Sequence, residues 1–99
     1  MYYAILCEDV ENSLPLRQGA RADHLARIRE LVDAGRLLAA GPHPALDTEE
    51  PGEAGFTGSL IIAEFDSLEA ATAWADSDPY ANAGVFSRVT VKPYKVVLP

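Results

Sequence analysis

His24 and Asp78 are the two residues of this sequence best suited to moving a proton. Histidine is a frequent general base in enzymes, and a carboxylate bonded to one ring nitrogen fixes the tautomer in which the other nitrogen accepts a proton. Each residue also has a plainer explanation. His24 can be a core-edge histidine with one hydrogen bond, and Asp78 can be the N-cap of a short helical turn that starts at Pro79. Spacing alone leaves both interpretations open.

Metal binding and nucleophilic catalysis have weaker support in the sequence. His43 lies between Pro42 and Pro44, and a metal site would need it to converge with His24 and a carboxylate, although no dense ligand spacing suggests this. Cys7 lies in an apolar run without an evident base partner, so we expect a small core residue rather than a nucleophile. No glycine-rich segment has the pattern of a phosphate-binding loop. We therefore expect neither a metal nor an organic cofactor.

The composition is typical of a globular protein with an acidic surface. Of the 99 residues 48% are hydrophobic and 23% are charged, so we expect a single domain spanning residues 1–99. The formal net charge of −7 disfavours nucleic acids and anionic membranes as partners. The first ten residues lack the basic region of a signal peptide, and no apolar run is long enough to cross a bilayer. We expect a cytoplasmic protein.

The elements that must position His24 and Asp78 are indicated by the hydrophobic pattern. Apolar runs bounded by turn residues predict strands, and apolar residues at helical spacing, from Leu25 to Val32, predict an amphipathic helix. We expect Gly19 to divide the first helical region, and Asp66 to cap the second with Glu69 completing a capping box. The predicted strands are Tyr2–Glu8, Arg36–Pro42, Ser59–Phe65 and Val85–Leu98; the first helical region is Ser13–Ala34, the second follows Asp66, and residues 43–58 form a long acidic loop.

The order βαββαβ predicts a ferredoxin-like α+β fold, in which an antiparallel sheet carries both helices on one face. The segments YYAILC and SLIIAEF are apolar at nearly every position, whereas a sheet with one solvated face should alternate. The second face therefore needs a cover. The acidic loop is a poor one because it has few large apolar residues, so we expect a homodimer packed through the two sheet faces.

The chain resembles the YciI-like (YCII-related) family over nearly its whole length, through the stretches RADHLARIRELVDAGRLLAAGPHPALD, PGEAGFTGSLIIAEFDSLEAATAWADSDPY and AGVFSRVTVKPYKVV. The resemblance implies the dimeric α+β barrel, in which two ferredoxin-like subunits pack through their sheets. It also implies a histidine–aspartate active site, which by motif corresponds to His24 in RADHL and Asp78 in SDPY. Related barrels include muconolactone isomerases and a dehydrochlorinase acting on a chlorinated hydroxyhydroquinone.

Four further residues are candidates for contact with a small-molecule substrate. Arg21, one helical turn before His24, can hold an anionic group, or it can form a surface ion pair with an acidic neighbour such as Asp23 or Glu11. Ser59 can offer a hydroxyl to a pocket, or it can be a strand-end residue bonded to backbone. Pro79 and Tyr80 follow Asp78 directly; Tyr80 can close the pocket wall or simply pack.

Three functions fit these residues. The first is a cofactor-independent acid–base enzyme, of lyase, isomerase or dehydrochlorinase type, in which His24 moves a proton on a small polar or aromatic metabolite and Asp78 holds its tautomer. The second is a small-molecule-binding dimer without turnover. The third is a structural dimer or fusion partner in which the histidine–aspartate contact braces two helices. The first two require a cavity that reaches His24, whereas the third allows the site to be packed solid.

Overall fold

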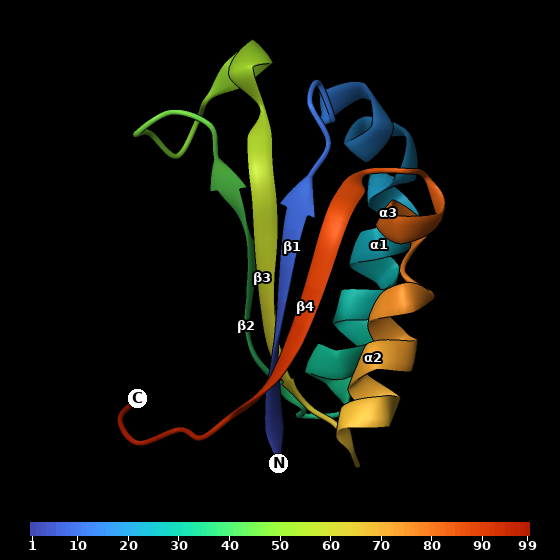
Figure 1. The fold of residues 1–99 in the computed structure, drawn as a ribbon. Coiled ribbons are helices and arrows are strands. Elements are labelled where there is room, and N and C mark those ends of the chain that lie inside the picture. Colours follow the sequence, from blue (N-terminus) through green and yellow to red (C-terminus); the bar gives the residue numbers. More distant parts are fainter.

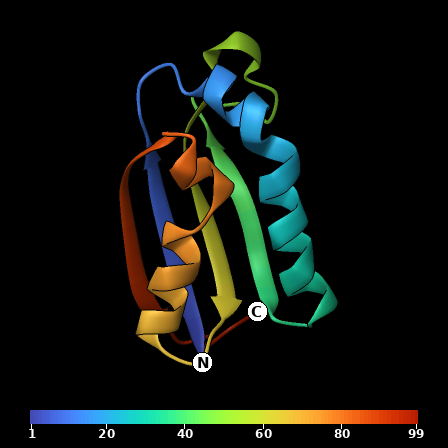
Figure 2. The same ribbon diagram turned by 90° about the vertical axis from the view of Figure 1, so that its right-hand side faces the viewer.

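The computed structural model describes all residues of the chain, Met1–Pro99. Its four strands form one antiparallel sheet in the order β2-β3-β1-β4, and all three α-helices lie on the same face of that sheet (Figures 1 and 2). The expected ferredoxin-like α+β fold is therefore confirmed. The elements are β1 (Tyr2–Asp9), α1 (Leu14–Asp33), β2 (Leu37–Pro44), a 3₁₀ turn (Gly52–Ala54), β3 (Phe56–Glu64), α2 (Leu68–Asp76), α3 (Pro79–Asn82) and β4 (Phe86–Tyr94).

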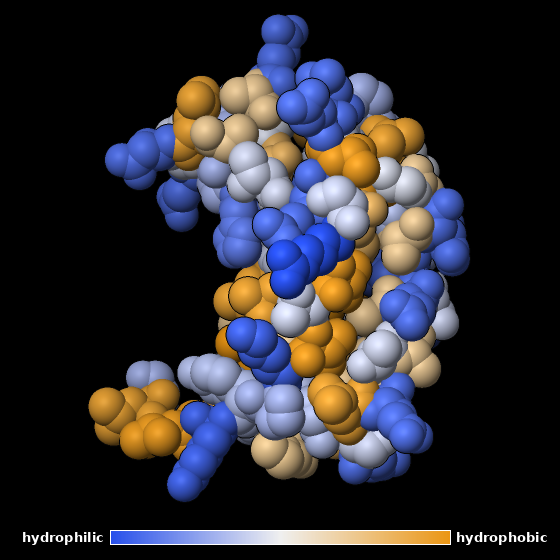
Figure 3. All heavy atoms as spheres, in the orientation of Figure 1, coloured by the Kyte–Doolittle hydropathy of each residue, from blue (hydrophilic) through white to orange (hydrophobic).

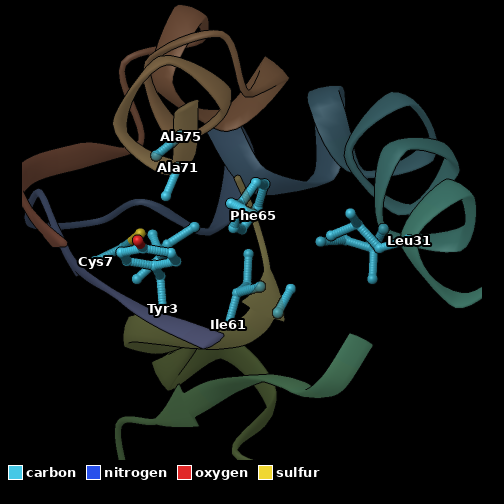
Figure 4. Packing of buried hydrophobic residues seen from close by; sticks show 10 residues of the cluster. Tyr3, Cys7, Leu31, Ile61, Phe65, Ala71 and Ala75 are labelled. Carbon is cyan, nitrogen blue, oxygen red and sulfur yellow. The ribbon is translucent and has the colours of Figure 1, made fainter. Parts of the chain in front are cut away.

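The core lies between the sheet and the helices. Alternate residues of β1, namely Tyr3, Ile5 and Cys7, point toward the helices because successive side chains of a strand face opposite sides. They pack with residues of β3, α1 and α2, and Figure 4 shows these side chains converging from the sheet and from the helices. The buried cluster consists of Tyr3, Ile5, Cys7, Ile28, Leu31, Ile61, Ala63, Phe65, Ala71 and Ala75.

The opposite face of the sheet is open. Leu6 remains 39% exposed there although it lies between the buried residues Ile5 and Cys7. Its partner on the neighbouring strand β3 is Leu60, and Ile62 lies two residues further along β3. This face forms the hollow side of the molecule, with hydrophobic residues at its floor (Figure 3). The loop between β2 and β3 and the C-terminal tail extend from opposite ends of the sheet on that side (Figure 1).

The expected division of the first helical region at Gly19 is wrong, because α1 runs unbroken from Leu14 to Asp33. A glycine in a helix costs only about 1 kcal/mol relative to alanine. That is less than the contribution of the buried residues Ile28 and Leu31, each of which stabilises the packed helix by about 1.5–3 kcal/mol. Gly19 itself is exposed, and a Cβ atom there would meet nothing within 4 Å.

The second helix begins one residue later than expected. Its N-cap is Ser67, whose Oγ accepts a hydrogen bond of 3.0 Å from the Ala70 backbone N–H, so the expected cap at Asp66 is wrong. A serine and an aspartate are nearly equal as caps, and the sequence offers them side by side. Val32, expected on the apolar face of the first helix, lies in the last turn of α1 and is exposed. Leu68, in the first turn of α2, is also exposed.

The hairpin between β2 and β3 is longer, and the acidic loop shorter, than the sequence predicts. Pairing continues through His43 opposite Gly58 to Pro44 opposite Phe56. Prolines are tolerated in β2 because it is an edge strand, where some backbone N–H groups need no partner. Pro93 lies near the end of β4, the other edge strand, where the same rule applies. The fourth strand ends at Tyr94 and not at Leu98.

The helices of this chain are not of a kind that could span a membrane, because none combines the required length with sufficient apolar character.

Gly58 is the place where the sheet is least tolerant of a side chain. A Cβ atom there would lie only 2.2 Å from the backbone oxygen of Cys7, on the neighbouring strand. We predict that Gly58→Ala lowers the free energy of unfolding by about 1–3 kcal/mol because the two strands must separate. Gly19→Ala, the matched control, should instead raise it, by up to about 1 kcal/mol. Urea unfolding of the two variants measures both effects, and a Gly58→Ala protein as stable as the parent would contradict the prediction.

Candidate functional site

His24 occupies a buried position in the middle of α1. The residues of α1 that face the sheet are Arg17, His24, Ile28 and Leu31, at the spacings of one helical face. His24 is 8% exposed, so its ring is enclosed by the helices and the sheet and not by solvent. Because the ring is buried, its chemistry depends on which groups its two nitrogen atoms contact.

Asp78 links the end of α2 to the start of α3. Its backbone is extended, and its Oδ1 accepts a hydrogen bond of 2.8 Å from the Tyr80 backbone N–H, which makes it the N-cap of α3 with Pro79 at the first helical position. Its carboxylate also contacts His24, whose Nδ1 lies 2.8 Å from Oδ1 and 3.0 Å from Oδ2. Asp78 is 2% exposed. The expected contact is therefore present, and the same side chain is also the cap.

The contact with Asp78 leaves only one ring nitrogen of His24 available. A buried carboxylate accepts hydrogen bonds, so Nδ1 carries the hydrogen of the neutral ring and its N–H donates a hydrogen bond to Asp78. Nε2 then has a free lone pair, and no hydrogen bond within the chain involves it. This is the arrangement in which a neutral imidazole can accept a proton from another molecule.

Tyr80 forms one wall beside His24. The two rings are stacked, with centroids 3.8 Å apart and planes inclined by 9°. Tyr80 is 4% exposed, and burial raises the pKa of its hydroxyl above the usual value although the charges of Arg17 and Arg21 oppose the shift. The hydroxyl therefore stays protonated at neutral pH.

Arg17 is the residue of the site that the sequence analysis missed. Its Nε lies 2.6 Å and its Nη2 3.0 Å from the two carboxylate oxygens of Asp9, and Nη2 also donates to Ser59 Oγ at 2.7 Å and to the Gly58 carbonyl at 3.0 Å. The two charged side chains are 6% and 0% exposed, so this is a buried ion pair. The signal was available, because Arg17 precedes His24 by two helical turns on the same face.

The other residues expected to contact a substrate differ in burial and in their distance from the cavity. Ser59 is buried and accepts the hydrogen bond from Arg17. Arg21 is exposed, and it forms no ion pair with Asp23 or Glu11. Pro79 starts α3 but does not line the cavity described next.

A cavity of about 390 Å³ reaches His24 between α1 and the β2–β3 side of the sheet. Arginine, histidine, serine and tyrosine side chains form its polar part, and aliphatic and aromatic residues of α1, β2 and β3 form the rest. The site is therefore not packed solid. The lining residues are Leu14, Arg17, Gln18, Arg21, His24, Leu25, Ile28, Ala40, Gly41, Pro42, Phe56, Ser59, Ile61 and Tyr80.

The remaining candidates for chemistry lie apart from this cavity. No three histidine, cysteine, aspartate or glutamate side chains are grouped so that they could hold a metal ion. His43 lies on β2 next to Gly58 and is not part of the cavity lining. Burial, with a smaller contribution from the Asp78 carboxylate, raises the pKa of the Cys7 thiol to about 12. Cys7 is therefore a neutral core residue at physiological pH.

The sequence and the fold of this chain are similar to those of known proteins. The model of the YCII-related domain matches residues 1–95. The chain belongs to this family. It is 59% identical over 97 residues to protein YciI of Escherichia coli and to protein YciI of Shigella flexneri. Each of these matches covers 98% of this chain and 99% of the relative. An uncharacterized protein of Haemophilus influenzae is 54% identical over the same share of both chains.

One solved structure is also similar. It is the 5-chloro-2-hydroxyhydroquinone dehydrochlorinase TftG of Burkholderia phenoliruptrix AC1100 in complex with 2,5-dihydroxybenzoquinone. The TM-score is 0.84 at 28% sequence identity, and the match covers 96% of this chain and 94% of TftG. The family resemblance read from the sequence is therefore confirmed, and a fold of this kind carries an enzyme in at least one neighbour.

The Arg17–Asp9 pair supplies a test of what stabilises the site. Removing one partner leaves the other charge buried without compensation, so we predict that Arg17→Met and Asp9→Asn each lower the free energy of unfolding by about 3–5 kcal/mol. The double variant should lose less than the sum of the two, with a coupling energy of about 0.5–3 kcal/mol. Urea unfolding of the four proteins measures this coupling. Strictly additive losses would mean that the two side chains act independently.

Proposed function

We propose that this protein is a cofactor-independent acid–base enzyme in which His24 is the general base. The observation that carries the proposal is the pairing of Nδ1 with Asp78 while Nε2 has no partner and the ring lines a cavity. A substrate bound in that cavity would present its acidic proton to Nε2. The base would then become an imidazolium ion, which the Asp78 carboxylate stabilises at 2.8 Å.

The cavity favours a small, partly apolar substrate with an anionic or readily ionised oxygen. Arg21 brings a positive charge to its lining, and Arg17 lies beside it with Ser59. The flat Tyr80 and Phe56 rings suit a planar molecule. Enols and phenols have this character, because removal of their proton creates an oxyanion that nearby arginine side chains stabilise.

The chemistry of TftG offers a concrete reaction type for testing. A dehydrochlorinase removes hydrogen chloride, so the base takes the proton while the bond to chlorine breaks and chloride leaves with the electron pair. In this protein Nε2 of His24 would take that proton. Isomerase and lyase reactions begin with the same proton removal and are equally within reach of this side chain.

The second candidate is a binding domain that holds the same class of molecule without turning it over. It uses the same cavity, and it differs only in the role of His24, which would be a hydrogen-bonding group and not a base. The two candidates therefore make different predictions for a variant that lacks the imidazole.

We predict that His24→Ala lowers kcat by about 10²–10⁴ while the substrate still binds. Asp78→Asn should also lower kcat but keep α3 in place, since asparagine is nearly as good a cap as aspartate. Ligands are found first by thermal shift among small phenols, enols and 2,5-dihydroxybenzoquinone, and turnover is then followed with 5-chloro-2-hydroxyhydroquinone and the hits.

His43→Ala is the matched control for these variants, because it removes the other histidine without touching the cavity. If His24→Ala loses affinity for ligands that the parent protein binds but never converts, the binding domain is the better account. Full turnover by His24→Ala would contradict both the base and its support by Asp78.

We also propose that two copies of this single-domain chain pack through the open face of the sheet. Leu6, Leu60 and Ile62 make that face apolar, and it is hollowed between the β2–β3 loop and the C-terminal tail (Figure 3). A second sheet would fill the hollow and remove these side chains from water. Ser59 and Ile61 of the cavity lining face the helices and not the open side of the sheet, so each copy would keep its own site.

Sedimentation at micromolar concentration tests this packing. We predict twice the mass of the chain for the parent and a monomer for Leu6→Glu, because a buried unpaired carboxylate is strongly unfavourable in an apolar interface. Leu16→Glu is the control, since Leu16 is 40% exposed and Leu6 is 39% exposed, but Leu16 lies on α1. A parent that sediments as a folded monomer would overturn the dimer.

A further inference from the structure

Arg27 approaches Asp78 one helical turn beyond His24. Its Nη1 lies 3.8 Å from Asp78 Oδ2, and its Nη2 donates a hydrogen bond of 3.1 Å to the Trp74 carbonyl of α2. The guanidinium lies over the Trp74 ring, 4.4 Å from its centroid. Nη1 is buried and has no hydrogen-bond partner. The Arg27 side chain is 23% exposed.

The charge on Asp78 explains why a cation is needed here. A base must be neutral before it accepts a proton, yet Asp78 is 2% exposed and a carboxylate at such a position requires a compensating charge. A carboxylate with His24 as its only partner favours the protonated form of the ring over the neutral form. A second cation beside the carboxylate opposes that preference.

We infer that Arg27 is a positioning residue for His24, and that it acts through Asp78 by supplying the charge that allows the imidazole to remain neutral at rest. The inference rests on the proposed role of His24 as a base. Arg27 does not line the cavity, so it has no direct contact with a substrate there.

The geometry separates this role from that of an ordinary hydrogen-bond partner. A distance of 3.8 Å is too long for a hydrogen bond, but it is short for an interaction between charges. Arg27 therefore contributes its charge without competing for the carboxylate oxygens that bind His24 and the Tyr80 N–H. The Trp74 ring and carbonyl hold the guanidinium at that distance.

The other groups around Asp78 do not replace Arg27. His24 and Arg27 are the only basic side chains within 4.0 Å of its carboxylate. On α1, Arg17 is paired with Asp9, and Arg21 is exposed. On α3 the Tyr80 ring is stacked on His24, and on β1 the Cys7 thiol is neutral.

The test measures the charge state of the His24 ring directly and needs no substrate. We expect ¹⁵N and ¹H NMR titration to find that Arg27→Gln raises the affinity of His24 for a proton by roughly tenfold, since a charge a few ångströms away has been removed. Arg27→Lys should restore the parent behaviour. Arg29→Gln removes the same charge from an exposed position on the same helix and should change nothing, and His43 is an internal reference in every spectrum.

A purely structural Arg27 gives a different result. Its loss would lower the free energy of unfolding through Trp74 and leave the titration of His24 unchanged, and that outcome overturns the inference. If Arg27→Gln does not fold, Arg27→Met replaces it, because methionine keeps an apolar stem against Trp74. The NMR titration of His24 in Arg27→Met is then compared with that of the parent. The titration measures no turnover. An unchanged His24 titration would therefore overturn the role of Arg27 without contradicting the proposed reaction, which the turnover assay tests.

Discussion

The burial of the Asp78 carboxylate is the constraint around which this structure is organised. A charge at 2% exposure must be met by donors and by opposite charge, and two helices, α3 and α1, provide them. α3 supplies a backbone N–H, and α1 supplies His24 and Arg27 from successive turns. The same two carboxylate oxygens therefore orient His24 and cap α3, so the connection between α2 and α3 is held against α1 at the imidazole.

A second buried carboxylate repeats the arrangement two turns earlier along α1. Asp9 at the end of β1 is held by Arg17, which also reaches Ser59 and the Gly58 carbonyl of β3. α1 is thus attached to the sheet at one end by an ion pair and at the other by the apolar residues Ile28 and Leu31. The cavity opens between these two attachments, where the helix is held to the sheet without filling the space beneath it.

The parts of this structure that were predictable from the sequence are those decided by local patterns. Apolar strands such as Tyr2–Glu8 and the order of the elements were enough to predict the fold. The SDPY motif was enough to predict that Asp78 can cap a short helix. The expectations at Gly19 and Asp66 were wrong because a helix stop or a cap residue is only a weak local preference. Packing of α1 outweighed the glycine, and the neighbouring Ser67 took the place of Asp66 as the cap.

The spacing to His24 could place Arg17 on the sheet-facing side of the helix, but the partners of Arg17 and Arg27 could not be predicted from the sequence. An arginine on a helix is usually a solvated residue, and nothing in the chain near either one indicates a buried carboxylate as its partner. Asp9 and Asp78 come from other elements, and only the folded arrangement brings them within reach. The sequence left open whether a cavity reaches His24, because the walls of the cavity come from α1, α3, β2 and β3.

The alternation of side chains along β3 has a consequence for how this family can diversify. Ser59 faces the cavity while its neighbour Leu60 faces the open side of the sheet, and the same division holds for Ile61 and Ile62. A substitution at one position can therefore change the wall of the cavity without altering the open face of the sheet, and a substitution at the next can do the reverse. One strand of nine residues thus carries two surfaces on which selection can act separately.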